Sequence, residues 1–287
     1  MYYLNNVDWH VTDRCNLRCI SCGHFCPLVN YQTLEYDRTI EDAEKDFKIL
    51  YEKTNNGEFI KNITLTGGEC TLNKQLPEII EVAEKYFNHK VTIWSNCINL
   101  SLYNQHLLEI IRKYNITINI TLYKPERKER ILEFFNKQNI NIQLFDKNFT
   151  GNDNPEFFKS FFTLDPIPNN ENLLWCEPKF NCCQLKEQKL YVCQYMAYLP
   201  YLFDYFKNNN SKKIGFDNSN KYLDLNEINN YQEIEQYILN YNEEICQHCI
   251  DKWSYVDFQE KVYKRVQPWK VSNKEIGEWI IKNINEL

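Results

Sequence analysis

Residues 7–22 read Val7-Asp8-Trp9-His10-Val11-Thr12-Asp13-Arg14-Cys15-Asn16-Leu17-Arg18-Cys19-Ile20-Ser21-Cys22. The run from Val7 to Thr12 is typical of a strand, and three cysteines follow it with three and then two residues between them. Three thiolates clustered in this way can ligate three irons of a cubane 4Fe–4S cluster and leave the fourth iron without a protein ligand. The stretch therefore predicts a metal centre just past the end of the first strand.

A second motif, Thr66-Gly67-Gly68-Glu69, also stands at the end of a strand-like run. On these two motifs the chain resembles the radical S-adenosylmethionine superfamily, whose cluster motif is C-x3-C-x2-C and whose second signature is Gly-Gly-Glu. The resemblance implies an open-iron 4Fe–4S cluster on Cys15, Cys19 and Cys22, which cleaves S-adenosylmethionine to a 5′-deoxyadenosyl radical. A structural zinc site completed by Cys26 is the alternative, but it leaves the Gly-Gly-Glu motif unexplained.

The resemblance also implies which residues contact the cofactor. The Gly-Gly-Glu segment receives the methionyl amino group, and the ends of the next two strands contact the ribose or carboxylate. The candidate cofactor-binding residues are Gly67, Gly68, Glu69, Ser95, Asn96 and Thr121. For Ser95 and Thr121, hydrogen bonding at a strand end is an equally good interpretation.

Two cysteines occupy positions where the superfamily usually has other residues. Cys70 follows Gly-Gly-Glu in place of proline, and Cys97 follows Asn96 where glycine is frequent. One interpretation is that each is a small hydrophobic residue in the core. The other is catalytic, with a thiol that donates hydrogen to a substrate radical and so completes an epimerisation.

Composition limits the class of protein. The 287 residues carry a formal net charge of −6, which argues against a nucleic-acid-binding surface. The sequence contains neither a signal peptide nor an apolar run long enough to span a membrane. Twelve cysteines without a secretion signal indicate metal ligation in a reducing, cytoplasmic setting rather than disulfides.

The first half of the chain alternates short β-branched runs with helical patterns, which predicts an α/β fold with parallel strands. The resemblance makes residues 1–150 a partial (β/α)6 barrel of the TIM type, although the spacing alone also fits an open sheet. Residues 151–175 lack a clear period and are predicted to be a bridging segment.

Residues 176–287 contain the other six cysteines and resemble the twitch or SPASM extensions of the superfamily, which bind an auxiliary 4Fe–4S cluster. Gln184-Leu185 and Leu190-Tyr191-Val192 are expected to form a β-hairpin, with Gln188 where the family signature has glycine. Helical patterns near 231–239 and 275–284 follow. The expected ligands are Cys176, Cys193, Cys246 and Cys249, with Cys182 or Cys183 as a replacement for Cys176. A structural zinc site from the same cysteines is the alternative.

The resemblance implies a radical enzyme, an oxidoreductase or epimerase that abstracts hydrogen from an unactivated carbon and is supplied with electrons by a flavodoxin or ferredoxin. Peptide-modifying members often carry a leader-recognition domain before the first cluster cysteine, which is residue 15 here. A small polar substrate, such as a sugar or nucleotide sugar, is therefore expected. A maturase of a ribosomal peptide or protein side chain is the second hypothesis, and a metal-stabilised binding protein without turnover is the third.

Overall fold

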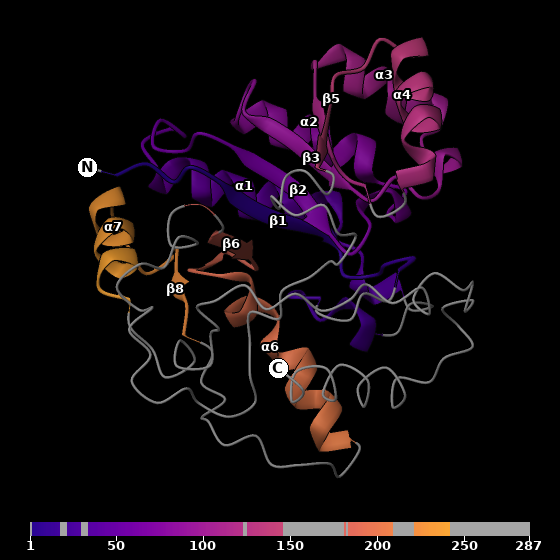
Figure 1. Cartoon of the computed structure of the whole chain (residues 1–287). Helices are drawn as coiled ribbons and strands as arrows, with labels where there is room; N and C mark the ends of the chain where they lie inside the picture. The colour runs from indigo at the N-terminus through magenta and orange to yellow at the C-terminus, as the bar shows by residue number, and fades with distance from the viewer. Residues whose placement is uncertain are drawn as a thin grey trace.

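The computed structural model describes residues 2–17, 22–29, 34–122, 125–145, 181, 183–208 and 221–241. Within these ranges eight strands form one sheet in the order β5-β4-β3-β2-β1-β6-β7-β8 (Figure 1). The first five are β1 (Val7–Thr12), β2 (Ile63–Gly67), β3 (Val91–Ser95), β4 (Thr117–Thr121) and β5 (Ile142–Phe145). All five run parallel, as the sequence predicts.

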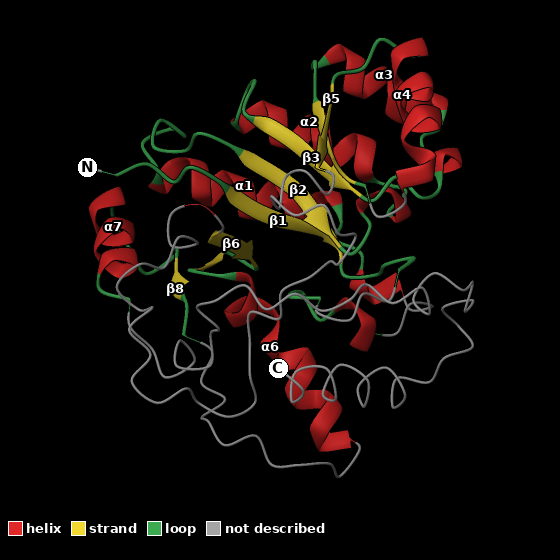
Figure 2. Cartoon of the chain, viewed as in Figure 1, coloured by secondary structure: helices red, strands yellow, loops and turns green. Residues whose placement is uncertain are grey.

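Helices alternate with these strands. They are α1 (Ile40–Lys53), α2 (Leu76–Tyr86), α3 (Gln105–Lys113) and α4 (Lys128–Lys137). Short 3-10 turns occupy Cys26–Leu28 (η1), Leu34–Tyr36, Cys70–Leu72, Leu100–Leu102 (η4) and Pro125–Arg127. Each crossover from β1 to β5 moves one place along the sheet in the same direction, so right-handed connections put these helices on one face (Figure 2). This sequential order is consistent with the arc of a partial barrel, since a doubly wound sheet reverses its order at a switch point.

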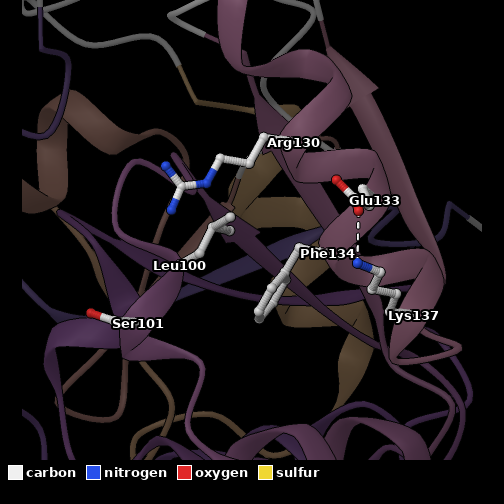
Figure 3. A pocket seen from close by; sticks show the side chains of 6 residues that line it. All are labelled: Leu100, Ser101, Arg130, Glu133, Phe134 and Lys137. Atoms are coloured by element: carbon white, nitrogen blue, oxygen red, sulfur yellow. Dashed lines mark hydrogen bonds and ion pairs between the residues drawn. The ribbon is translucent and has the colours of Figure 1, made fainter.

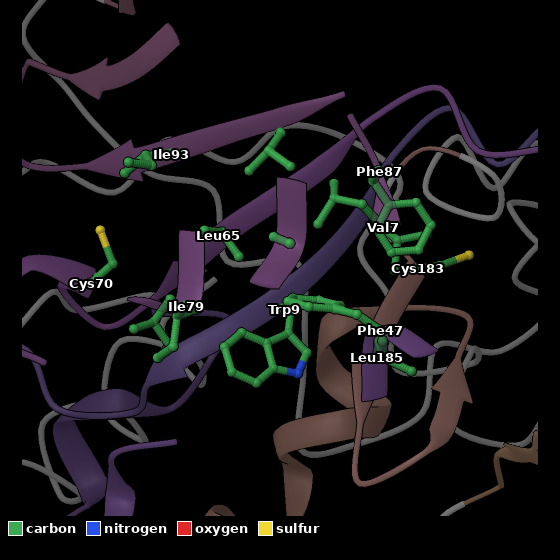
Figure 4. Packing of buried hydrophobic residues seen from close by; sticks show 14 of the residues in the cluster. Val7, Trp9, Phe47, Leu65, Cys70, Ile79, Phe87, Ile93, Cys183 and Leu185 are labelled. Carbon is green, nitrogen blue, oxygen red and sulfur yellow. The ribbon is translucent and has the colours of Figure 1, made fainter. Parts of the chain in front are cut away.

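Alternation along the strands separates an apolar face from a polar one. Trp9 and Leu65 point toward the helices, where Trp9 packs on Phe47 of α1 with ring centroids 5.0 Å apart (Figure 4). Helix α1 begins at a capping box, in which the Thr39 and Asp42 side chains each accept from the other residue's backbone N–H. The core therefore lies between the sheet and α1–α4, and it continues into the second half of the chain.

The second half of the chain extends the same sheet. Strands β6 (Cys183–Lys186) and β7 (Lys189–Tyr191) form the predicted antiparallel hairpin, and β8 (Leu223–Asp224) pairs with β7. Strand β6 also pairs in parallel with β1, on the side away from β2, with Leu185 opposite Trp9. The hairpin is thus hydrogen-bonded to the first strand of the barrel arc.

Two helices accompany this part of the sheet. Helix α6 (Gln194–Asn208), which the sequence patterns do not predict, packs against β6 and η1. Helix α7 (Tyr231–Leu239) lies beside the N-terminal residues (Figure 1), where the Tyr231 hydroxyl donates to the Tyr2 carbonyl at 2.6 Å. Among the helices that are described, none is long and apolar enough to cross a membrane.

Several sequence predictions fall outside the described residues. They are the bridging segment 151–175, the helical pattern near 275–284, and Cys19, Cys176, Cys182, Cys246 and Cys249.

Candidate active site

The two motifs meet where β1 and β2 end. The Gly68 N–H donates to the Thr12 carbonyl and the Glu69 N–H donates to the Arg14 carbonyl, both at 2.9 Å. The Arg14 side chain is fixed by two hydrogen bonds to the Asp37 carboxylate, of 2.8 and 2.6 Å. The Gly-Gly-Glu segment is therefore bonded directly to the chain that leads into Cys15.

Both glycines are required by this contact. A Cβ on Gly67 would lie 2.0 Å from the Thr12 carbonyl oxygen, and the φ of Gly67 is +130°. A Cβ on Gly68 would lie 2.1 Å from the Arg14 carbonyl oxygen and 2.8 Å from the Cβ of Cys15. No side chain fits at either position, because the opposing atoms belong to the backbone or lie beside it.

Glu69 joins the ends of β2 and β3. Its carboxylate is buried and accepts from the Ser95 hydroxyl and from the Asn96 N–H, each at 2.8 Å, and from the Thr71 hydroxyl at 2.7 Å. Burial raises the pKa of Glu69, and these hydrogen bonds oppose that effect. Glu69 and Ser95, two predicted cofactor residues, thus contact each other.

Asn96 and Thr121 also lie at this edge of the sheet. The Asn96 side-chain amide donates to the Asn16 side-chain oxygen at 2.8 Å, which connects the end of β3 to the residue after Cys15. Thr121 lies farther along the sheet, where its hydroxyl accepts from the Trp94 indole N–H at 2.7 Å. The structure therefore brings Asn96 close to the cysteines, whereas the hydrogen bond shown for Thr121 is to Trp94.

Cys15 and Cys22, the described cysteines of the first motif, lie with Cys26 in one apolar cluster. Cys15 and Cys26 are buried with Leu17, and Cys22 and Ile98 pack against them. The Leu17 N–H donates to the Cys15 sulfur at 3.3 Å, and a hydrogen bond from Cys26 lowers the pKa of Cys22 to about 6. Apolar surroundings and N–H donors to sulfur suit thiolates that ligate iron, so these residues fit a 4Fe–4S cluster.

The side chains of Cys70 and Cys97 point into the core, away from the carboxyl ends of the strands. Both are buried: the Cys70 thiol donates to the Trp94 carbonyl and the Cys97 sulfur contacts the Tyr103 hydroxyl, each at 3.3 Å. Burial raises the pKa of Cys97 to about 12. A packing role fits these contacts better than the hydrogen-donor role, which stays a prediction.

Cys183 and Cys193, from the second cysteine region, have different surroundings. Cys183 lies in the apolar core opposite Val7, as Figure 4 shows, and such packing gives it no evident approach to a metal. Cys193 is half-buried and immediately precedes α6. The predicted ligand Cys193 is therefore better placed than the replacement ligand Cys183.

Sequence reasoning missed a buried polar network next to the cysteine loop, by which we mean the described residues 13–17 and 22–25 that carry Cys15 and Cys22. The Asp13 carboxylate contacts His10 Nδ1 at 2.5 Å and Arg38 at 3.2 Å, and it accepts from the Tyr201 hydroxyl. Burial, with the nearby His24, lowers the pKa of His10 to about 3, so His10 is neutral. Its ring stacks on Tyr198 of α6 with centroids 3.8 Å apart. His10 and Asp13, a histidine in β1 and a carboxylate just after it, were the available signal.

A hollow on the outer side of the arc, between η4 and α4, contains none of the predicted residues (Figure 3). It is lined by Leu100, Ser101, Arg130, Glu133, Phe134 and Lys137. The Lys137–Glu133 ion pair at its rim is solvent-exposed. This hollow lacks the cysteines and glycines of the site.

Comparisons with known proteins agree with this geometry. Residues 9–147 match the model of the Radical SAM superfamily, so this part of the chain is similar to that superfamily. Members of that superfamily are enzymes, and the family implies S-adenosylmethionine and a 4Fe–4S cluster. No curated protein sequence matches the chain.

Solved structures similar to the chain include anSMEcpe with bound AdoMet, at 15% identity and a TM-score of 0.34, over 48% of this chain and 43% of that one. The chain thus spans less than half of that protein. Streptococcus suis SuiB bound to S-adenosylmethionine is 12% identical with a TM-score of 0.47, over 85% and 67% of the two chains. SuiB bound to precursor peptide SuiA is 15% identical with a TM-score of 0.38, over 86% and 70%. Sequence identities and TM-scores this low carry no argument about the substrate of this protein.

Proposed function

We propose that the protein is a radical S-adenosylmethionine enzyme that abstracts hydrogen from a carbon of a small polar substrate and thereby oxidises or epimerises it. The observation that carries this proposal is the direct bonding of Gly68 and Glu69 to the backbone before Cys15. Two motifs fifty residues apart in sequence are built into one site, as a cofactor-cleaving centre requires.

In this proposal, each group of site residues has its own role. Cys15, Cys19 and Cys22 hold the 4Fe–4S cluster, which when bound supplies the electron for cleaving S-adenosylmethionine. Because neither Gly67 nor Gly68 has a side chain, this segment packs directly on the backbone before Cys15, beside the cysteines, where the cofactor's methionyl end is expected to bind. Glu69 fixes Ser95 and the Asn96 N–H, so that the end of β3 is rigid where the ribose or carboxylate is expected to bind.

The sheet face opposite the helices supports a polar substrate. Asp8, Thr64 and Thr92 face one another across three neighbouring strands in the registers of β1, β2 and β3. Asn119 of β4 and Gln143 of β5 continue this polar face. A packed barrel interior would carry branched apolar residues at such positions. The side chains of Asp8, Thr64 and Thr92 are hydrogen-bonded to Gln184, to Asn6 and to one another, and a sugar-like molecule that binds this face replaces some of these bonds with its own hydroxyls.

Anaerobic incubation with dithionite and S-adenosylmethionine tests the reaction. We expect the reconstituted protein to form 5′-deoxyadenosine, and the triple variant Cys15→Ala, Cys19→Ala, Cys22→Ala to form none. Absence of cleavage by the reconstituted wild-type protein would refute the enzymatic proposal and favour a metal-stabilised binding protein.

An auxiliary 4Fe–4S cluster on Cys176, Cys193, Cys246 and Cys249, in a twitch-like region spanning residues 176–287, is part of the proposal. Cys193, which is half-buried and lies between the hairpin and α6, supports it. Analysis of anaerobically purified protein distinguishes the alternatives: about eight irons per chain indicates two cubane clusters, and about four irons with zinc indicates a structural zinc site.

Modification of a ribosomal peptide or a protein side chain is the second candidate. It requires the polar face to receive a peptide segment rather than a sugar. Incubating the active enzyme with nucleotide sugars and with candidate peptides encoded by neighbouring genes, each in deuterated solvent, separates the two. Deuterium incorporation into a sugar supports epimerisation of a small substrate, whereas a changed peptide mass supports the maturase.

A further inference from the structure

His24 contacts two separate parts of the site at once. Its Nδ1 lies 3.3 Å from the carbonyl oxygen of Gly67, and its Nε2 lies 2.7 Å from the side-chain oxygen of Gln194 at the start of α6. His24 is two residues beyond Cys22, so one imidazole connects the cysteine loop, the Gly-Gly-Glu segment and α6. Neither motif accounts for this residue.

The hydrogen-bonding chemistry fixes one side of the ring. A carbonyl oxygen only accepts, so Nδ1 carries the proton and donates to Gly67. On the other side, Nε2 either donates to the Gln194 oxygen or, with the side-chain amide turned over, accepts from its N–H. In both cases the ring is hydrogen-bonded at both nitrogens.

Ring contacts hold His24 in this orientation. Its centroid lies 4.4 Å from that of His10 on β1 and 5.6 Å from that of Tyr198 on α6. His10 and Tyr198 are themselves stacked. The imidazole is therefore supported by the first strand and by the same helix that supplies Gln194.

Gly23 supplies the space that Gln194 occupies. A Cβ on Gly23 would lie 2.3 Å from the Gln194 side-chain nitrogen and 2.9 Å from its amide carbon. Both of these atoms belong to a flexible side chain, and the backbone at Gly23 is not in the left-handed region. An alanine at this position is therefore expected to displace Gln194 without straining its own backbone.

We propose that His24 and Gln194 form a positioning contact, through which α6 holds the Gly67 carbonyl and the cysteine loop in the arrangement that S-adenosylmethionine binding needs. This inference rests on the proposed function. Because Cys193 directly precedes Gln194, the same contact links the second cysteine region to the first. His24 and Gln194 act through the loop and are not catalytic residues.

A double-mutant cycle in the reconstituted full-length chain tests the contact. The readout is the change in the electron paramagnetic resonance spectrum of the reduced cluster on titration with S-adenosylmethionine. We expect Gln194→Ala and Gly23→Ala each to weaken binding by about tenfold, equivalent to about 1.4 kcal/mol. The double variant is expected to bind no more weakly than Gln194→Ala, because alanine at 194 leaves room for the new Cβ.

Two further variants make the result specific. Gln194→Met keeps the length of the side chain but lacks the amide and is expected to bind as weakly as Gln194→Ala, which separates loss of the contact from general damage to α6. His106→Gln changes an exposed histidine that contacts Glu78, and it is expected to leave binding unchanged.

The outcomes distinguish this inference from the proposed function. Wild-type affinity in both single variants, or additive losses in the double variant, would overturn the positioning contact while leaving the enzymatic proposal intact. No spectral response to S-adenosylmethionine in the wild-type protein would overturn both.

Discussion

At the residue scale, the glycines of the site differ in what a side chain would meet. Replacing Gly68 by alanine puts a Cβ against the Arg14 carbonyl, and relief requires moving the backbone that leads into Cys15. We expect Gly68→Ala to lower the free energy of unfolding by about 3 kcal/mol and to lose the first cluster. Urea unfolding and iron content are the measurements.

Gly23→Ala is the matched control, because its Cβ meets only the end of the flexible Gln194 side chain. It is expected to retain iron and to lose less than about 1 kcal/mol. Equal unfolding midpoints for Gly68→Ala and wild type would show that the Gly-Gly-Glu segment does not press against the cysteine loop.

His10 gives the fold a pH dependence. Burial, with the nearby His24, holds its pKa at about 3 in the folded protein, whereas an unfolded histidine titrates near 6.5. The unfolded chain therefore takes up a proton first as the pH falls below 6.5. Above pH 6.5 the neutral His10 contributes fully to the free energy of unfolding. As the pH falls below 6.5, this contribution decreases by up to about 1.4 kcal/mol per pH unit. Stability should decline steadily between pH 6.5 and pH 4.

His10→Gln isolates this effect. The glutamine amide can still donate to Asp13 but does not titrate, so we expect a shallower decline of unfolding free energy over the same pH range. The charged groups around the site, Asp13, Arg38 and Lys186, remain in place. His106→Gln removes an exposed histidine and should keep the wild-type slope. An unchanged slope in His10→Gln would contradict the assignment.

The motifs predicted where the site residues lie better than they predicted what those residues contact. Gly67 ends β2 and Gly68 and Glu69 follow it, and the contacts that the structure shows for them are with the backbone of the cysteine loop and the end of β3. His10 and Asp13 had no motif to mark them. Their pairing depends on Arg38 and Tyr201, which come from distant parts of the chain.

At the scale of single elements, the hairpin turn explains a departure from the family signature. Glu187 and Gln188 both adopt positive φ, of 54° and 62°, between β6 and β7. Consecutive left-handed residues are typical of a type I′ turn, which favours glycine at its second position. Gln188 thus adopts a backbone conformation that favours glycine over a residue with a side chain.

Gln188→Gly should therefore stabilise the protein. The backbone N–H of residue 188 still donates to Asp46 on α1, and only a long side-chain contact with Asn226, at 3.4 Å, is lost. We expect a gain of about 0.5–1 kcal/mol in the free energy of unfolding, measured with urea. Gln143→Gly, in the extended strand β5, should be destabilising instead. A loss of stability in Gln188→Gly would rule out this account of the turn.

Periodicity identified most elements because packing on one face imposes it. The strands and α1–α4 follow apolar alternation that the sheet and its helices require. Helix α6 escaped because it combines aromatic residues with an internal Pro200, which lacks an N–H and usually ends a helix. The hairpin was predicted from Gln184-Leu185 and Leu190-Tyr191-Val192, but nothing in these residues showed which strand it would join.

At the scale of the whole molecule, β1 is the central connection. It pairs with β2 on one edge and with β6 on the other, although β6 lies more than 170 residues away in the sequence. A pattern of apolar residues does not name a pairing partner, so this junction was beyond sequence reasoning. It also means that the predicted boundary at residue 150 separates strands that share hydrogen bonds.

A fragment comprising residues 1–150 is therefore expected not to fold cooperatively. It would lose the parallel partner of β1, the hydrogen bond from Gln184 to Asp8 and the Tyr201 hydroxyl that donates to Asp13. A buried carboxylate deprived of a donor is costly, and an exposed strand edge invites aggregation. Circular dichroism during urea unfolding measures this, with the full-length chain as the control. A sharp transition in the fragment would show that the barrel arc is stable without β6 and α6. A gradual one would show that the second cysteine region is needed to build the first site.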